Sequence, residues 1–445
     1  MTAALQAGRH ALVYCVQAGA YDRLGGFASG VVTSTHDPLL LAVLLPHLEA
    51  AAASAPEGRP RWSCLCYLAD ALSHGGRADA SLPFYEQAAT LARTAAEAQG
   101  ENRRQAWADV GWITGNWAVA LAMTRDLDAS RQRHLDSAEA SKNASQAVVY
   151  VIRSELEALR IDIMQGRAVQ ALPQVEARLA QVEAWWRQHR AGQRVLEAPD
   201  PEFLARGLIS ALDIALEAHF AKKDWEPALR RINAILEVKR ALGRPAEDIA
   251  KDRMNRAVVL GRLSCFGKAK AELEACLQVF QNDPANSAKV LSSLADLFDE
   301  QDDVAQAITQ ERRALALYEQ LPDPRDRAIS HNNLAGYLVV SEERSGVPSA
   351  LAESPRHQLA ALIYRLVAGL GQDLQTSLHN YAIRFRRAQA ACTPLTVPRV
   401  AELLADPAFR PLDDWLRQRQ HDLAEVQAAV DEALDTARQA ALGQK

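Results

Sequence analysis

The stretch Asp224-Trp225-Glu226-Pro227-Ala228-Leu229 contains the local pattern that decides the fold of this chain. A polar break is followed at once by an aromatic residue, and three places later comes a small residue at the start of an apolar helical pattern. Weaker copies recur at 19–24, 76–81, 166–168, 265–269 and 302–307. Recurrence of one helix–turn–helix unit is typical of a solenoid, in which each unit packs only against its neighbours.

Helical patterns continue through almost the whole chain, and strand patterns are nearly absent. Leu204, Leu208, Leu212 and Leu216 recur at helical spacing and predict one buried stripe. No sustained period-two alternation and no Asn-Gly or Asp-Gly hairpin is present. Apolar residues make up 49% of the 445 residues and aromatic residues only 6%, so alanine and leucine must supply the core of closely packed helices. The sequence therefore predicts an all-α fold.

Proline-containing breaks divide the predicted helices into three parts. The clearest break is Ala198-Pro199-Asp200-Pro201, because a residue before proline disfavours helical geometry. Residues 411–442 form a helical pattern rich in charges and glutamines, which is what a solenoid needs to cover its last apolar face. We predict N-terminal repeats over 1–198, central repeats over 199–392 with an enlarged loop near 341–355, and a C-terminal helical cap over 393–445.

Charge and cysteine usage favour a cytoplasmic protein without a nucleic-acid or membrane partner. The net charge of −5 gives no basic stripe of the kind that nucleic acid demands. The cysteines stand among apolar helical residues and are expected to be buried and reduced; they are Cys15, Cys64, Cys66, Cys265, Cys276 and Cys392. Residues 1–12 do not resemble a signal peptide, and the apolar run 38–48 is too short to span a bilayer.

The sequence contains no recognisable catalytic, cofactor or metal motif. H-E-x-x-H, G-x-S-x-G, C-x-x-C, G-x-G-x-x-G and the phosphate loop G-x-x-x-x-G-K-[ST] are all absent. Cys64 and Cys66 are two residues apart, so they point to different faces of a helix and make a poor metal pair. We expect no enzyme activity, no cofactor, no metal and no small-molecule substrate.

Two stretches resemble the tetratricopeptide repeat family. Residues 330–338, Ser-His-Asn-Asn-Leu-Ala-Gly-Tyr-Leu, resemble the first helix of the longer repeats of kinesin light chains and bacterial regulators, and 254–260 resemble a degenerate copy. The resemblance covers roughly residues 5–390, although the central spacing is about 40 residues rather than 34. In its overall sequence pattern, rather than in one motif, the chain is similar to the repeat regions of bacterial signalling ATPases and caspase-like proteases.

This resemblance implies a right-handed α-solenoid of antiparallel helix pairs, whose first helices line a concave face. If the turns set the register, four asparagines fall near one position of these first helices: Asn116, Asn255, Asn333 and Asn380. In the family an asparagine there holds the main chain of an extended peptide, since a carboxamide both donates and accepts. Lys251 and Arg262 should flank Asn255 on the same face. The alternative for each asparagine is a cap or a bridge between helices, and for each charge a solvated helix face.

Three functional hypotheses follow. The first is a protein- or peptide-binding scaffold, a sensor or adaptor in bacterial signalling or regulation that binds an extended segment on its concave face. The second is a nucleic-acid-linked regulator controlled by peptide binding. The third is an enzyme whose site the sequence does not reveal.

Overall fold

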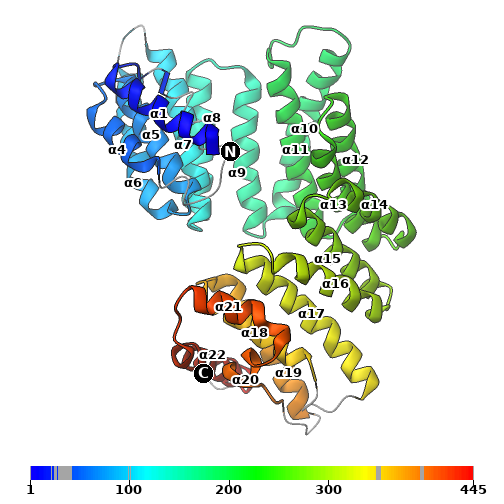
Figure 1. The fold of residues 1–445 in the computed structure, drawn as a ribbon. Helices are drawn as coiled ribbons and strands as arrows, with labels where there is room; N and C mark the ends of the chain where they lie inside the picture. The colour runs from blue at the N-terminus through cyan, green and yellow to red at the C-terminus, as the bar shows by residue number, and fades with distance from the viewer. Residues whose placement is uncertain are drawn as a thin grey trace. The chain divides into compact units, whose positions relative to one another are not determined.

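The computed structural model describes residues 2–21, 23, 24, 28, 43–98, 100, 102–346, 352–390 and 395–443 (Figure 1). Every regular element in these ranges is a helix, which confirms the predicted all-α class. The chain divides into two compact units, residues 1–238 (unit 1) and 239–445 (unit 2), and the division lies inside helix α12 (Trp225–Ala241). The predicted domain boundaries at 198 and 392 stay predictions.

Unit 1 is a row of helices in which each helix from α1 to α11 packs against its neighbours in the chain. The helices are α1 (Thr2–Gln17), α4 (Leu45–Ser54), α5 (Arg59–His74), α6 (Ala78–Glu97), α7 (Arg103–Met123), α8 (Leu127–Asn143), α9 (Val148–Met164), α10 (Ala168–Arg190), α11 (Pro201–Lys222) and most of α12. Short turns make successive helices antiparallel (Figure 1). The odd-numbered helices also touch one another, α5 with α7 and α9 with α11, so they form one layer of the unit.

Unit 2 continues the same alternation and ends in a cap. The helices are α13 (Ala246–Arg262), α14 (Phe266–Val279), α15 (Pro284–Glu300), α16 (Val304–Tyr318), α17 (Pro324–Ser345), α18 (Ser354–Val367), α19 (Gly371–Ala390), α20 (Val400–Leu404), the 3-10 turn η2 (Pro407–Phe409), α21 (Arg410–Gln418) and α22 (Leu423–Ala441). Helix α22 packs on α18 and α19 and buries Val426, Val430 and Leu434 there, as the predicted C-terminal cap requires. Helix α17 continues to Ser345, five residues into the segment predicted as an enlarged loop, and 347–351 lie outside the described residues.

The recurring break in the sequence is a left-handed residue that ends one helix and turns the chain into the next. Lys223, Ser264 and Asp302 have φ values of 58°, 58° and 65°, and glycine takes this position at Gly76 and Gly166. In each case the next residue donates its N–H to the carbonyl five residues back; these bonds are Arg77 to Leu72, Arg167 to Asp162, Asp224 to His219, Cys265 to Leu260 and Asp303 to Phe298. The bond satisfies a carbonyl that the end of a helix would otherwise leave without a partner.

A small residue follows each of these turns, four places after the residue that donates the bond. The residues are Ser81, Ala171, Ala228, Ala269 and Ala307, and each is at most 2% exposed. A short side chain at this point lets the second helix of the pair approach the first closely. The spacing between turn and small residue is therefore the structural basis of the recurring pattern.

The five described cysteines are free thiols, buried except for the half-buried Cys265, whereas Cys392 lies outside the described residues. Burial raises the pKa of the Cys64 and Cys276 thiols to about 11. None of the described helices is long and apolar enough to cross a membrane.

The tight crossing at Ala228 can be tested by overpacking. Ala228→Trp should lower the free energy of unfolding by about 1–3 kcal/mol, because a fully buried position has no room for an indole. Hydrogen exchange should show faster opening first in α11 and α12, next to the substitution. Glu226→Trp, at an exposed position of the same turn, is the matched control. Faster exchange only at a distant end of the chain would show that the register is wrong.

A buried carboxyl group on α16 makes the stability of unit 2 depend on pH. Glu311 is fully buried and accepts hydrogen bonds from the hydroxyls of Ser330 (2.6 Å) and Ser292 (3.2 Å), while its Oε2 has no partner. Burial raises the pKa of Glu311 from 4.5 to about 7. The folded protein thus holds a proton that the unfolded chain has released, so this group's contribution to stability is lost as the pH rises from 4.5 through 7.

Glu311→Gln removes this titration and keeps a side chain that bonds both serines. The variant should gain stability over the wild type as the pH rises from about 5 to about 8, by up to about 3 kcal/mol. Urea unfolding across this range measures the gain, and Glu274→Gln, at an exposed carboxylate of α14, serves as the control. A difference that does not change with pH would contradict the assignment.

Candidate functional site

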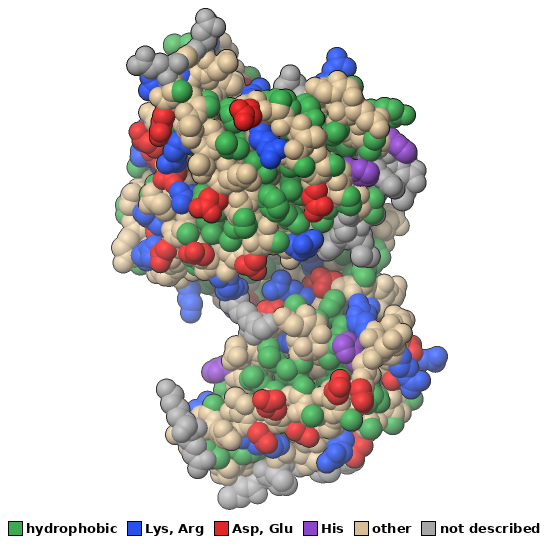
Figure 2. All heavy atoms as spheres, turned by 90° about the vertical axis from the view of Figure 1, so that its left-hand side faces the viewer, with side chains coloured by type: hydrophobic (Ala, Val, Ile, Leu, Met, Phe, Trp, Pro, Cys, Tyr) green, Lys and Arg blue, Asp and Glu red, His purple; other side chains and the backbone are tan. Residues whose placement is uncertain are grey.

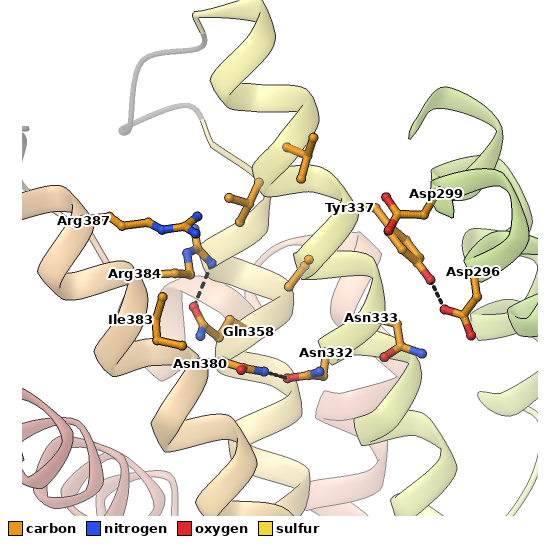
Figure 3. Close-up of a pocket in the computed structure, with 14 residues that line it drawn as sticks. Asp296, Asp299, Asn332, Asn333, Tyr337, Gln358, Asn380, Ile383, Arg384 and Arg387 are labelled. Carbon is orange, nitrogen blue, oxygen red and sulfur yellow. Dashed lines mark hydrogen bonds between the residues drawn. The ribbon is translucent and has the colours of Figure 1, made fainter. Parts of the chain in front are cut away.

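The candidate site is a cavity of about 430 Å³ in unit 2, formed mainly by helices α15, α17 and α19. These are odd-numbered helices, the first members of their pairs, so the cavity lies on the layer that the repeat pattern predicts to be the inner one. Figure 3 shows how side chains from the three helices converge on it. Two hydrogen bonds connect neighbouring helices here: Tyr337 on α17 donates to Asp296 on α15, and Asn380 Nδ2 on α19 donates to Asn332 Oδ1 on α17 at 3.1 Å.

One side of the cavity is acidic. Asp296 and Asp299 on α15 both line it, three residues apart and therefore on one face of the helix. Tyr337 holds the carboxylate of Asp296 by its hydroxyl (Figure 3). Arg262 on α13 pairs with Glu300 at 2.6 Å rather than directly with either aspartate. Among the described residues, neither Asp296 nor Asp299 forms an ion pair, so the acidic side of the cavity keeps its carboxylates unpaired.

The opposite side of the cavity is basic. Arg384 on α19 donates to Gln358 Oε1 and to Ser354 Oγ, both at 2.7 Å, so its hydrogen bonds go to neutral oxygens (Figure 3). Burial lowers the pKa of Arg384, and the charges of Glu342, Glu343 and Tyr381 oppose this effect. Arg387, one turn further along, is exposed and lies 4.0 Å from Glu343. An anionic group entering this side would meet the guanidinium of Arg384, which makes no ion pair with a described carboxylate.

The carboxamide of Asn333 lies between the two charged sides of the cavity. Asn333 lines the cavity, and its side chain makes no hydrogen bond to any described residue, so both its donor and its acceptor are available. Ala335 and Gly336 also line the cavity. A Cβ built on Gly336 would meet nothing within 4 Å, which shows open space above the helix. A main chain could therefore come close to α17 at this point.

The structure brings together two of the four predicted asparagines. Asn333 and Asn380 line this cavity, although the Asn380 amide is already bonded to Asn332. Asn255 and Lys251 are exposed on α13 and do not line it. Asn116 lies in unit 1, where it donates to Asp70 Oδ1 at 3.1 Å and lines a different cavity.

Sequence reasoning did not single out Asn332, Tyr337 or Gln358 as site residues. A usable pattern existed on α19, where Asn380, Ile383, Arg384 and Arg387 recur at intervals of three and four and so lie on one helix face. Gln358 had no such pattern, because it comes from α18, a second helix of a pair, and reaches the site only through tertiary packing. No cluster of histidine, cysteine and acidic residues suited to a metal ion occurs in the described part of the chain.

No protein-family model matches the sequence, and no curated protein matches it. Solved structures do show similarity. The apo form of RapI is 9% identical, with 99% of each chain covered and a TM-score of 0.52. A Rap protein complexed with competence and sporulation factor is 10% identical, covering 96% of this chain and 99% of that one, with a TM-score of 0.45. The signal transduction ATPase from Pyrococcus horikoshii with a tetratricopeptide repeat sensor is 13% identical over 84% of this chain and 55% of that one, with a TM-score of 0.45.

At these identities the similarity concerns the fold alone. The likeness to RapI extends over nearly the whole of both chains, and it agrees with the antiparallel helix pairs and the cap seen in the structure. The chain has the fold of a tetratricopeptide-type right-handed α-solenoid with a C-terminal capping helix.

Proposed function

We propose that this chain is a protein- or peptide-binding scaffold, and that the cavity of unit 2 holds an extended segment of its partner. One observation carries the proposal: a carboxamide without a partner, Asn333, lies between an acidic side and a basic side of one cavity. The volume of about 430 Å³ lies within the range of about 300–1,000 Å³ that is common for ligand sites.

An extended main chain suits the middle of the cavity. A peptide group offers one N–H and one C=O, and the carboxamide of Asn333 presents the complementary acceptor and donor. The open space over Gly336 allows close approach of the bound chain. Recognition of this kind reads the backbone rather than one particular side chain.

The two charged sides of the cavity determine the direction in which the bound segment runs. A basic group of the partner would lie against Asp296 and Asp299, and an acidic group against Arg384 and Arg387. The reversed orientation would bring like charges together, so complementarity fixes which way the segment runs. The preferred partner is therefore a segment with charges of both signs.

The cellular location and role are proposed by analogy with proteins of similar fold. We place the protein in the cytoplasm of a bacterium, as a sensor or adaptor in signalling or regulation without enzyme activity; the likeness in fold to RapI supports this. No specific observation favours the nucleic-acid alternative. On the face drawn in Figure 2, acidic and basic side chains are interspersed among apolar ones and form no basic stripe.

A displayed library of random decapeptides, selected on the full chain, tests the proposal. Calorimetry with a selected peptide should show weaker binding to Asn333→Ala by about 1–3 kcal/mol, because peptide groups lose their partner. The melting temperature should change little, since the side chain is not part of the core. Asn282→Ala, at an exposed turn position of the same unit, should bind as the wild type does. Unchanged affinity together with a lowered melting temperature would show that Asn333 is structural.

The predicted role of Asn255 needs a longer segment, because this residue is exposed on α13 outside the cavity. For selected peptides that extend past Asp299 towards α13, Asn255→Ala should also weaken binding by about 1–3 kcal/mol. Removing the peptide residues that lie beyond Asp299 should abolish the effect of Asn255→Ala on affinity. If no selected peptide that reaches α13 distinguishes Asn255→Ala from the wild type, Asn255 has no part in binding.

A further inference from the structure

A second cavity, of about 420 Å³, lies in unit 1 and is not used by the proposed function. It is lined by residues of α7, of α8 and of α9, together with Gln146 in the turn before α9. The candidate site of unit 2 shares none of its residues. The two sites can therefore be tested separately, and the failure of one leaves the other unaffected.

Two buried polar side chains in this cavity lack partners. His134 is 6% exposed and Ser141 is 4% exposed, and both line the cavity. Neither side chain makes a hydrogen bond to a described residue. They lie seven residues apart on α8, about two helical turns, so both are on the same helix face. A ligand or water in the cavity can complete their hydrogen bonds.

Several neighbouring polar groups of the cavity do have partners. Ser137 donates to the carbonyl of Gly111 at 2.7 Å and lies 3.0 Å from the hydroxyl of Ser154. Glu157 accepts from Arg160 at 2.8 Å. The packing of α8 against α7 is close, since a Cβ on Gly111 would lie 3.3 Å from Ser141 Oγ. The cavity is therefore bounded by well-packed helices rather than by a loose region.

The charges in the cavity leave one positive charge without a counter-ion. Arg160 is paired with Glu157 at 2.8 Å and Glu217 at 3.1 Å. Arg153 lies over the ring of Phe203, 5.6 Å from its centroid, and no carboxylate among the described residues pairs with it. Burial lowers the pKa of His134 to about 4, so at neutral pH its imidazole adds a hydrogen-bond donor and no charge.

These groups suit a singly charged carboxylate. One guanidinium balances one negative charge, and the imidazole N–H of His134 can donate to a carboxylate oxygen. Ser141 lies about 10 Å further along α8, so its hydroxyl is left for another polar group of the ligand or for water. A dianionic phosphate would keep an uncompensated charge beside Glu157. Two aromatic rings add apolar walls: Trp112, 5.4 Å from Tyr67, and Tyr150, stacked on Phe203 at 4.1 Å. A short apolar stem attached to the carboxylate would lie against them.

We propose that the cavity of unit 1 is a binding site for a carboxylate on a short apolar stem, held by Arg153 and His134. Two sources offer this chemistry: the side chain of a glutamate in a peptide, and a free small carboxylic acid such as glutarate. Both present the same group to the same donors.

The test is a titration of the full chain followed by the imidazole resonances of His134, which are assigned by their loss in His134→Asn. The probes are acetyl-glutamate amide, its acetyl-glutamine counterpart, glutarate and inorganic phosphate. The glutamate probe should give a saturable shift and the glutamine probe none, because only the first carries the anion. Arg153→Gln should weaken binding about ten-fold or more. Arg103→Gln, at the exposed start of α7, is the control and should change nothing.

Each outcome of the titration either supports or overturns the proposed carboxylate site. Tighter binding of the capped glutamate than of glutarate supports the site and assigns it to a peptide side chain, whereas the reverse order supports the site and assigns it to a free acid. Equal shifts with the glutamine probe, a preference for phosphate, or binding that Arg153→Gln leaves unchanged would each overturn the proposal. A circular dichroism melt of Arg153→Gln shows that the variant is folded, which is expected because Arg153 is exposed.

Discussion

The architecture depends on one local hydrogen bond. Where a helix ends in a left-handed residue, the next N–H donates to the carbonyl five residues back, and the chain reverses into the second helix of the pair. Four residues later a buried small residue lets the two helices pack closely, as Ala228 and Ala307 do. Five helix pairs are built in this way, so much of the fold is set by local chemistry that recurs along the chain.

The candidate site is a consequence of this repetition. Alternate helices are brought into one layer, and residues about 40 to 50 positions apart become neighbours, as the bond between Asn332 and Asn380 shows. Layers of this kind position side chains from several helices without any single helix carrying a motif. This explains why a site with opposite charges around Asn333 can exist in a chain without catalytic or cofactor motifs.

The sequence predicted the fold better than the site, for a physical reason. The turn at Asp224 and the small residue at Ala228 are local, so they are visible in the sequence. The site depends on which residues of different helices meet, and this register shifts with each helix length. Asn333 and Asn380 were therefore predicted together and do line one cavity, whereas Asn255 and Asn116 lie elsewhere. Gln358 belongs to α18, the second helix of its pair, so a pattern based on first helices could not predict it.

A crystal structure of the full chain with a selected peptide tests the central claim most directly. The account predicts an extended main chain in the cavity of unit 2, with a peptide group bonded to the carboxamide of Asn333. A basic group of the peptide should lie towards Asp299 and an acidic group towards Arg384. A peptide bound on another surface, or bound in the cavity without a main-chain bond to Asn333, would contradict the account.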